Sequence, residues 1–286
     1  MFLQSFHLSF SHSRTYALLP PPLIPSPFLP PEWSLPLFAL FFLRKMVKTI
    51  NIGGVEDHLP DEHAQYEEVF TAAGDVMKHA LDVLNDPDFE EKKGGWKPDC
   101  SSDDVTIHYK DNSSGRYFAG RCKIKVSAKD MNTEFWDHLD RNHEWNDNIK
   151  QARRVKKLTD NTDYFHYTSN DVFIIKSREV VAARAMREIN GAYILACRSV
   201  SLPKEIPELK GSVRAHLHIS VSRVRPDPED PAHSCIYDYV ICTDLKGMMF
   251  RSAVNQVLGR ATMKDIENIR VHANTVLRPQ LYPGLK

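Results

Sequence analysis

One stretch near the C-terminus constrains the fold more than any other part of the chain. Along Val213–Val221 apolar residues fall on odd positions, while polar residues such as His216 and Ser220 fall between them. This period of two is typical of a strand with one buried face. A second strand-like run, Cys235–Cys242, follows, and a long helix is predicted over Met249–Thr275. A curved antiparallel sheet closed by one C-terminal helix can enclose a cavity, so we expect the chain to hold a ligand rather than to process a polymer.

The preceding part of the chain also favours antiparallel pairing. A helix is predicted over residues 61–84, where apolar positions follow helical spacing, and a shorter helix is predicted over residues 130–139. Short turns between the strands favour antiparallel neighbours. The sequence therefore predicts an α+β domain over residues 61–279, in which a bent sheet grips a helix. The remaining strands are predicted around residues 105–110, 121–126, 151–158, 163–168, 179–187 and 192–199.

Charge and cysteine content narrow the functional classes. The 286 residues include 37 basic and 37 acidic side chains, so the formal net charge is zero. A balanced charge does not favour bulk electrostatic capture of nucleic acid or of an acidic membrane. The five cysteines are scattered, odd in number and contain no CxxC pair. We expect buried free thiols in a reducing compartment.

The first 45 residues do not resemble the rest. Eight prolines lie between Pro20 and Pro36, and the apolar run Trp33–Leu43 is shorter than the ~20 residues that a spanning helix needs. Its basic residues follow the apolar run, whereas a signal sequence carries them before it. Three interpretations stay open for residues 1–45: a disordered extension, a targeting or anchoring segment, or translation that begins at Met46. Residues 46–60 are interpreted as a polar linker and residues 280–286 as a tail.

Three separated blocks resemble one known family. The run Asp244–Gly247 followed by Ser252–Leu258 resembles the C-terminal motif of the StAR-related lipid transfer (START) domain. Glu144–Lys150 is similar to the Glu-Trp-Asn segment of that family, and Ser177–Glu179 to its Pro-Arg-Asp strand entry. The blocks occur in the family's order, and members of the steroidogenic type are the most similar. Leu217 stands where those members carry a tunnel histidine.

The resemblance implies a helix-grip fold, with a nine-stranded antiparallel sheet around the C-terminal helix and one lipid in an internal tunnel. Glu144 and Arg178 match the acid and the arginine that pair inside the family's tunnel. A buried pair must satisfy itself, and its spare hydrogen-bonding capacity could hold a lipid hydroxyl directly or through water. The alternative is an ion pair that only stabilises the fold. The other lipid-contact candidates are Leu217, Tyr239, Phe250, Val254, Val257 and Leu258.

Two segments are candidates for movement and membrane contact. The C-terminal helix must shift to admit a lipid if it closes the tunnel. An apolar tip at Val172, Phe173 and Ile174 follows polar residues and is expected to dip into a bilayer, the alternative being a buried loop.

The main hypothesis is a monomeric, non-enzymatic lipid carrier. It would hold one sterol or phospholipid, contact membranes transiently, and work in the cytoplasm at membrane surfaces. We find no GxSxG elbow, no GxxxxGK[ST] loop and no HExxH motif, and His216-x-His218 lacks a complete ligand set, so no metal, cofactor or nucleic-acid partner is expected. Two alternatives stay open. One is a cavity enzyme of the thioesterase or cyclase type, with Glu144 or a nearby histidine as base. The other is a lipid-sensing regulator without transport.

Overall fold

The computed structural model describes residues 48–102, 104–171, 175–202, 204–247 and 250–285. These residues belong to one unit that begins at residue 47. The expectations for residues 1–45 and for the tip at Val172, Phe173 and Ile174 lie outside the described residues. Within the described ranges, no helix is both long enough and apolar enough to cross a membrane.

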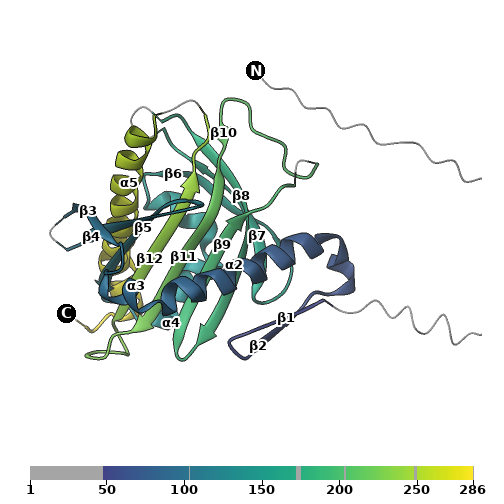
Figure 1. The fold of residues 1–286 in the computed structure, drawn as a ribbon. Coiled ribbons are helices and arrows are strands. Elements are labelled where there is room, and N and C mark those ends of the chain that lie inside the picture. The colour runs from purple at the N-terminus through teal and green to yellow at the C-terminus, as the bar shows by residue number, and fades with distance from the viewer. Residues whose placement is uncertain (1–47, 103, 172–174, 203, 248–249, 286) are drawn as a thin grey trace, which may run out of the picture. The chain divides into compact units, whose positions relative to one another are not determined.

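The described chain forms a large antiparallel sheet, which confirms the predicted α+β helix-grip class (Figure 1). A short extra strand, β10 (Val213–Arg214), pairs in parallel with β8 at the side of this sheet. The edge strand β3 was not predicted, because Pro98 and a short polar sequence give it no clear period of two. It lies at the edge, where a strand tolerates proline. The spatial order is β3 (Lys97–Ser101), β4 (Thr106–Asn112), β5 (Gly115–Ile124), β12 (Cys235–Asp244), β11 (His216–Pro226), β9 (Ala192–Ser199), β8 (Arg178–Ile189), β7 (Thr162–Ser169) and β6 (Ile149–Lys157).

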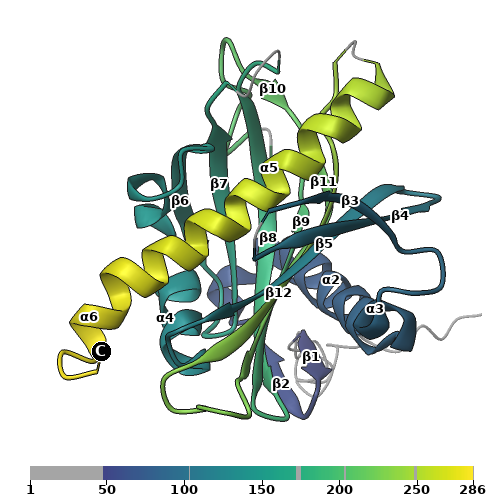
Figure 2. The same cartoon turned by 90° about the vertical axis from the view of Figure 1, so that its left-hand side faces the viewer.

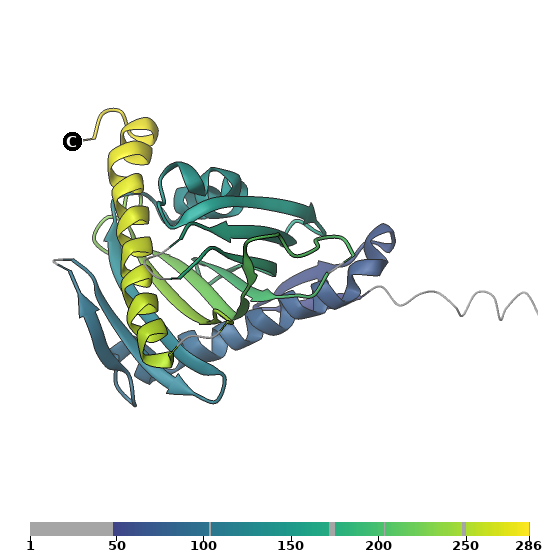
Figure 3. The same ribbon diagram turned by 90° about the horizontal axis from the view of Figure 1, so that it is seen from above.

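Helices cover both faces of the sheet. Helix α2 (Glu67–Asn85), which a 3-10 turn η1 (Asp61–Tyr66) precedes, packs its apolar stripe on one face. Helix α5 (Arg251–His272) crosses the opposite, concave face, and α4 (Ala128–Asp137) lies beside it (Figures 2 and 3). The shorter helical segments are α3 (Pro87–Glu91), η2 (Leu139–Glu144), the π-helical turn η3 (Ala273–Leu277) and α6 (Arg278–Leu281).

The segment that we expected to be a polar linker contains a β-hairpin. Strands β1 (Thr49–Ile52) and β2 (Val55–His58) pair through a turn at Gly53 and Gly54, which both adopt positive φ. Ile50 of this hairpin packs closely on Gly74 of α2. A Cβ atom added at Gly74 would lie only 2.6 Å from Ile50 Cδ1. The hairpin is therefore part of the packed domain, and the glycine pair was the turn signal in the sequence.

Candidate functional site

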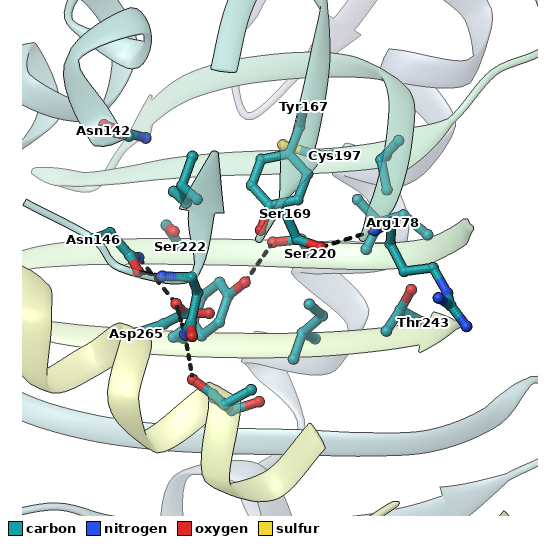
Figure 4. A pocket seen from close by; sticks show the side chains of 18 of the residues that line it. Asn142, Asn146, Tyr167, Ser169, Arg178, Cys197, Ser220, Ser222, Thr243 and Asp265 are labelled. Atoms are coloured by element: carbon teal, nitrogen blue, oxygen red, sulfur yellow. Dashed lines mark hydrogen bonds between the residues drawn. The ribbon is translucent and has the colours of Figure 1, made fainter. Parts of the chain in front are cut away.

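A cavity of about 290 Å³ lies between the concave face of the sheet and α5 (Figure 4). Small-molecule sites typically measure ~300–1,000 Å³, so this volume suits one compact ligand. Most of its wall is apolar, and burying apolar ligand surface there is favourable by roughly 25 cal/mol per Å². Apolar side chains from five strands, from the segments that flank β8 and β12, from α5 and from the α4–η2 region line it: Phe135, Leu139, Ile149, Phe165, Ile175, Val180, Leu195, Ile241, Leu245, Ala261 and Ile269.

A β-bulge in β11 decides which of its side chains reach the cavity. Leu217 pairs with Thr243, and Ile219 pairs with the next residue of β12, so His218 is an extra residue. One inserted residue reverses the alternation of side chains between the two faces. Leu217 consequently lines the cavity, whereas Ile219 packs in the core beneath α2. The prediction that all odd positions of Val213–Val221 share one face is therefore wrong.

The bulge also brings hydroxyl groups into the cavity wall. Ser220 and Ser222, on the even positions after the bulge, line the cavity opposite two tyrosines of β12. Ser220 Oγ donates to the Tyr239 hydroxyl at 3.4 Å, and Ser222 Oγ lies 3.2 Å from the Tyr237 hydroxyl. Burial raises the pKa of both phenols, so each keeps its proton at neutral pH.

The acid in the cavity wall is Asp265, from the middle of α5. Its Oδ1 accepts hydrogen bonds from Asn146 Nδ2 at 2.9 Å and from Asn148 Nδ2 at 2.8 Å (Figure 4). Burial raises the pKa of Asp265, and these two amides oppose the rise. Sequence reasoning missed this residue. The signal was present, because Asp265 lies four residues from both Ala261 and Ile269 on the cavity-lining stripe of α5.

The predicted pair of Glu144 and Arg178 is not formed. The Glu144 side chain is 53% exposed and lies outside the cavity wall, with its carboxylate 3.6 Å from Arg141. The physical reason is the 3-10 helix η2, whose three residues per turn direct Leu139 and Asn142 to the cavity and Glu144 away from it.

Arg178 does line the cavity. Figure 4 shows it on the opposite side of the pocket from Asp265. Its guanidinium donates to the backbone oxygens of Leu245 at 2.6 Å and Lys176 at 2.6 Å. Burial lowers its pKa. Arg178 thus joins the start of β8 to the segment that leads into α5.

A different arginine forms a buried ion pair at the cavity wall. Arg184 of β8 lines the cavity, and its guanidinium binds Asp163 of β7 through distances of 2.6 and 3.0 Å. It also donates to the backbone oxygens of Phe135 and Trp136 at the end of α4. These contacts use the donors of Arg184 for the fold, so the pair stabilises the junction between α4 and the sheet.

The other predicted contact residues divide into two groups. Leu217, Tyr239, Val257 and Leu258 line the cavity. Phe250 precedes the first turn of α5 and is 86% exposed, so it does not line the cavity. Val254 lines a neighbouring hollow instead. Both residues were assigned to the stripe because the helix was predicted to begin at Met249, whereas Phe250 precedes α5 and Val254 lies in its first turn.

Comparisons with known proteins agree with this architecture. A family model described as the START domain matches residues 76–275. The chain is similar to the Steroidogenic acute regulatory-like protein 1 of Caenorhabditis elegans, with 33% identity over 80% of this chain and 88% of that protein. It is 22% identical to the mitochondrial Steroidogenic acute regulatory protein of Danio rerio, over 73% of each chain.

A solved structure shows the same fold. Human StAR-related lipid transfer protein 5 superposes with a TM-score of 0.63 at 16% sequence identity. The match covers 73% of this chain and 97% of that one.

Proposed function

The chain belongs to the START domain family, and from that premise we propose that it carries one lipid between membranes in the cavity beneath α5. Family membership supports lipid binding and transfer in general. The observation that carries the proposal is the apolar hollow of about 290 Å³ between α5 and the sheet. Such a site shields an apolar molecule from water and needs no reacting group to do so.

The proposed ligand is a sterol or a phospholipid, and the cavity volume favours a single compact molecule. The volume of about 290 Å³ lies just below the ~300–1,000 Å³ range of small-molecule sites. A phospholipid with two acyl chains would require the cavity to widen on binding. The compact ligand is therefore the first candidate.

We propose that the lipid enters at the N-terminal end of α5. A second hollow lies between the β4–β5 turn and the segment Asp244–Gly247, and it shares Thr243, Leu245 and Leu258 with the cavity. The C-terminal half of α5 is held by buried polar contacts, among them Asn268 Nδ2 to Asn146 Oδ1 at 3.1 Å. Because the other end makes fewer such contacts among the described residues, it is the end that would move.

Phe250 supports a transient membrane contact at the same end. A large apolar side chain that is 86% exposed gains free energy when it enters a bilayer interface. Its place at the start of α5 would couple membrane docking to movement of the helix. We therefore propose that the protein binds membranes peripherally, and we keep the expectation of a monomer in the cytoplasm as part of the same proposal.

The enzyme alternative has weaker support. Its proposed base was Glu144 or a nearby histidine. Glu144 is half exposed and lies outside the cavity wall, and no histidine is among the described residues that line the cavity. The relatives are named for steroidogenic regulation and for lipid transfer.

Two measurements test the carrier proposal. Native mass spectrometry of the purified protein should show one lipid per chain, and solvent extraction should identify it. The protein should then accelerate the transfer of that lipid between donor and acceptor liposomes. Binding without transfer would support the regulator instead, and a purified protein that binds no lipid would contradict the proposal.

A further inference from the structure

The position of the Asp265 carboxylate is fixed by a built network. Asn146 is 3% exposed, and its Oδ1 accepts from Asn268 Nδ2 at 3.1 Å and from the Asn148 backbone N at 3.0 Å. Since the oxygen of Asn146 takes these donors, its Nδ2 must be directed at Asp265, as observed at 2.9 Å. Asn148 Nδ2 reaches the same oxygen, Oδ1, at 2.8 Å. Two side-chain amides thus hold one carboxylate oxygen in place, and Asn268 orients one of these amides.

The network leaves one oxygen of Asp265 unused. In the described part of the chain, Oδ2 accepts no hydrogen bond, and no Lys or Arg forms an ion pair with this carboxylate. Asp265 lines the cavity, so this oxygen is available to a bound molecule. Asp265 is partly exposed, and filling the cavity would remove this oxygen from water, so a ligand that supplies a donor avoids the cost of that desolvation.

Two tyrosines, Tyr167 and Tyr239, belong to the same cavity wall as this acceptor. The electrostatic effect of Asp265 adds to burial in raising the pKa of Tyr167 and Tyr239. Tyr239 accepts from Ser220, so the hydroxyl hydrogen of Tyr239 remains available. A ligand hydroxyl can donate to Asp265 and accept from Tyr239 at once, because a hydroxyl is both donor and acceptor.

We propose that Asp265 determines ligand specificity by selecting an uncharged lipid with a free hydroxyl group. This inference rests on the carrier function proposed above and names the ligand class for the same cavity. A ketone at that position offers no donor to Oδ2, and a carboxylate or phosphate adds a second negative charge in a largely apolar wall. An ammonium group would pair with Asp265, but its own desolvation offsets much of that gain.

The test compares two ligands that differ only at the polar group. A fluorescent sterol with a free 3-hydroxyl and its 3-ketone are titrated into the purified protein. We expect the alcohol to bind at least about tenfold more tightly than the ketone, because a site built for a donor rejects an analogue that lacks it. D265L should reduce this ratio to less than about threefold.

D265N is the matched variant that keeps the shape of the side chain. The amides of Asn146 and Asn148 continue to require its oxygen, so the new amide nitrogen faces the ligand as a donor. The preference should therefore shift toward the ketone. Y239F removes a donor but leaves Asp265 intact, so it should weaken both ligands and retain some preference for the alcohol. Circular dichroism melts establish that each variant is folded.

The outcomes separate the two proposals. Equal binding of alcohol and ketone by the wild-type protein, or an unchanged ratio in folded D265N and D265L, would overturn the role of Asp265 and leave the carrier intact. Tighter binding of an anionic phospholipid than of the alcohol would also overturn it. Binding of no lipid of either kind would refute the carrier function together with this inference.

Discussion

The Nε2 atom of His272, at the last turn of α5, lies 3.1 Å from Oε1 of Glu134 on α4. Both side chains are buried, and the other carboxylate oxygen of Glu134 lies 2.8 Å from His138 Nδ1. The ring of Trp145 stacks on His272 with centroids 4.8 Å apart. These contacts fasten the C-terminal end of α5, so motion of the helix should be largest at its other end.

Glu134 should make the protein sensitive to acid. Burial opposes its ionisation, but hydrogen bonds from His272 and His138 hold the pKa below its ordinary value of 4.5. A carboxyl with a lowered pKa stabilises the fold above its ordinary value, and this contribution is lost as pH falls through the lowered value. Urea unfolding of the wild type between pH 7 and pH 3 should show this loss. E134Q should show a shallower dependence, and an identical dependence would exclude the assignment.

Asp265 should have the opposite effect on stability. Its pKa is raised above the ordinary value of 3.8, so its contribution to stability is complete below that value and is lost as pH rises through the raised value. The free energy of unfolding of D265N should therefore increase relative to that of the wild type as the pH rises from 3 to 7. A difference that is constant over this range would show that Asp265 titrates normally.

A disulfide between α5 and β3 should stop lipid exchange. A Cβ added at Gly259 would lie 3.0 Å from Asp99 Cγ, which is close enough for a bridge between cysteines at these positions. D99C/G259C in a C100S background should retain bound lipid when oxidised but transfer it between liposomes at least about tenfold more slowly. Dithiothreitol should restore transfer, and the reduced protein is the control. Unimpaired transfer by the oxidised protein would show that transfer does not require movement of this part of α5.

Two tryptophan substitutions on β11 should distinguish a side chain that lines the cavity from one that packs in the core. L217W fills the ligand space, so it should lower the bound lipid measured by native mass spectrometry, with a stability change below about 1 kcal/mol. I219W overpacks the core beneath α2 and should destabilise by about 1–3 kcal/mol or more. Loss of lipid from a folded I219W together with normal loading of L217W would contradict the assignment of the two faces.

Phe250 should affect transfer but not stability. F250S removes an exposed ring, so the melting temperature should stay within about 2 °C of the wild type, as for most surface changes. Liposome transfer should fall severalfold, because less apolar surface enters the bilayer. V271S, an exposed valine at the far end of α5, is the matched control. Equal transfer by F250S and V271S would argue against a membrane contact at Phe250.

The sequence predicted the elements of the fold better than the details of the site. Strands such as β9 and β12 have a clear period of two and short turns, so their positions follow from local patterns. Local periodicity cannot reveal a bulge, which depends on pairing with the neighbouring strand. For that reason the pattern placed Ser220 on the side of β11 opposite to Leu217, whereas both side chains line the cavity.

The predictions for the charged residues of the site were wrong for a related reason. The direction of Glu144 depends on whether its segment forms a loop or a 3-10 turn, and the sequence does not distinguish the two. Asp265 was detectable as a single acid on an apolar helix stripe. Its partners Asn146 and Asn148 are more than a hundred positions away in the chain, so only the fold brings them together.

The surplus residue at His218 has a consequence for how such a chain can diverge. Without it, every later position of β11 would exchange sides, and the wall that now offers serine hydroxyls would offer the methyl groups of Ile219 and Val221. A single deletion could thus convert a polar part of the cavity wall into an apolar one, while the overall composition of the chain stayed almost the same. Cargo preference in this scaffold can evolve through insertion and loss as well as through replacement.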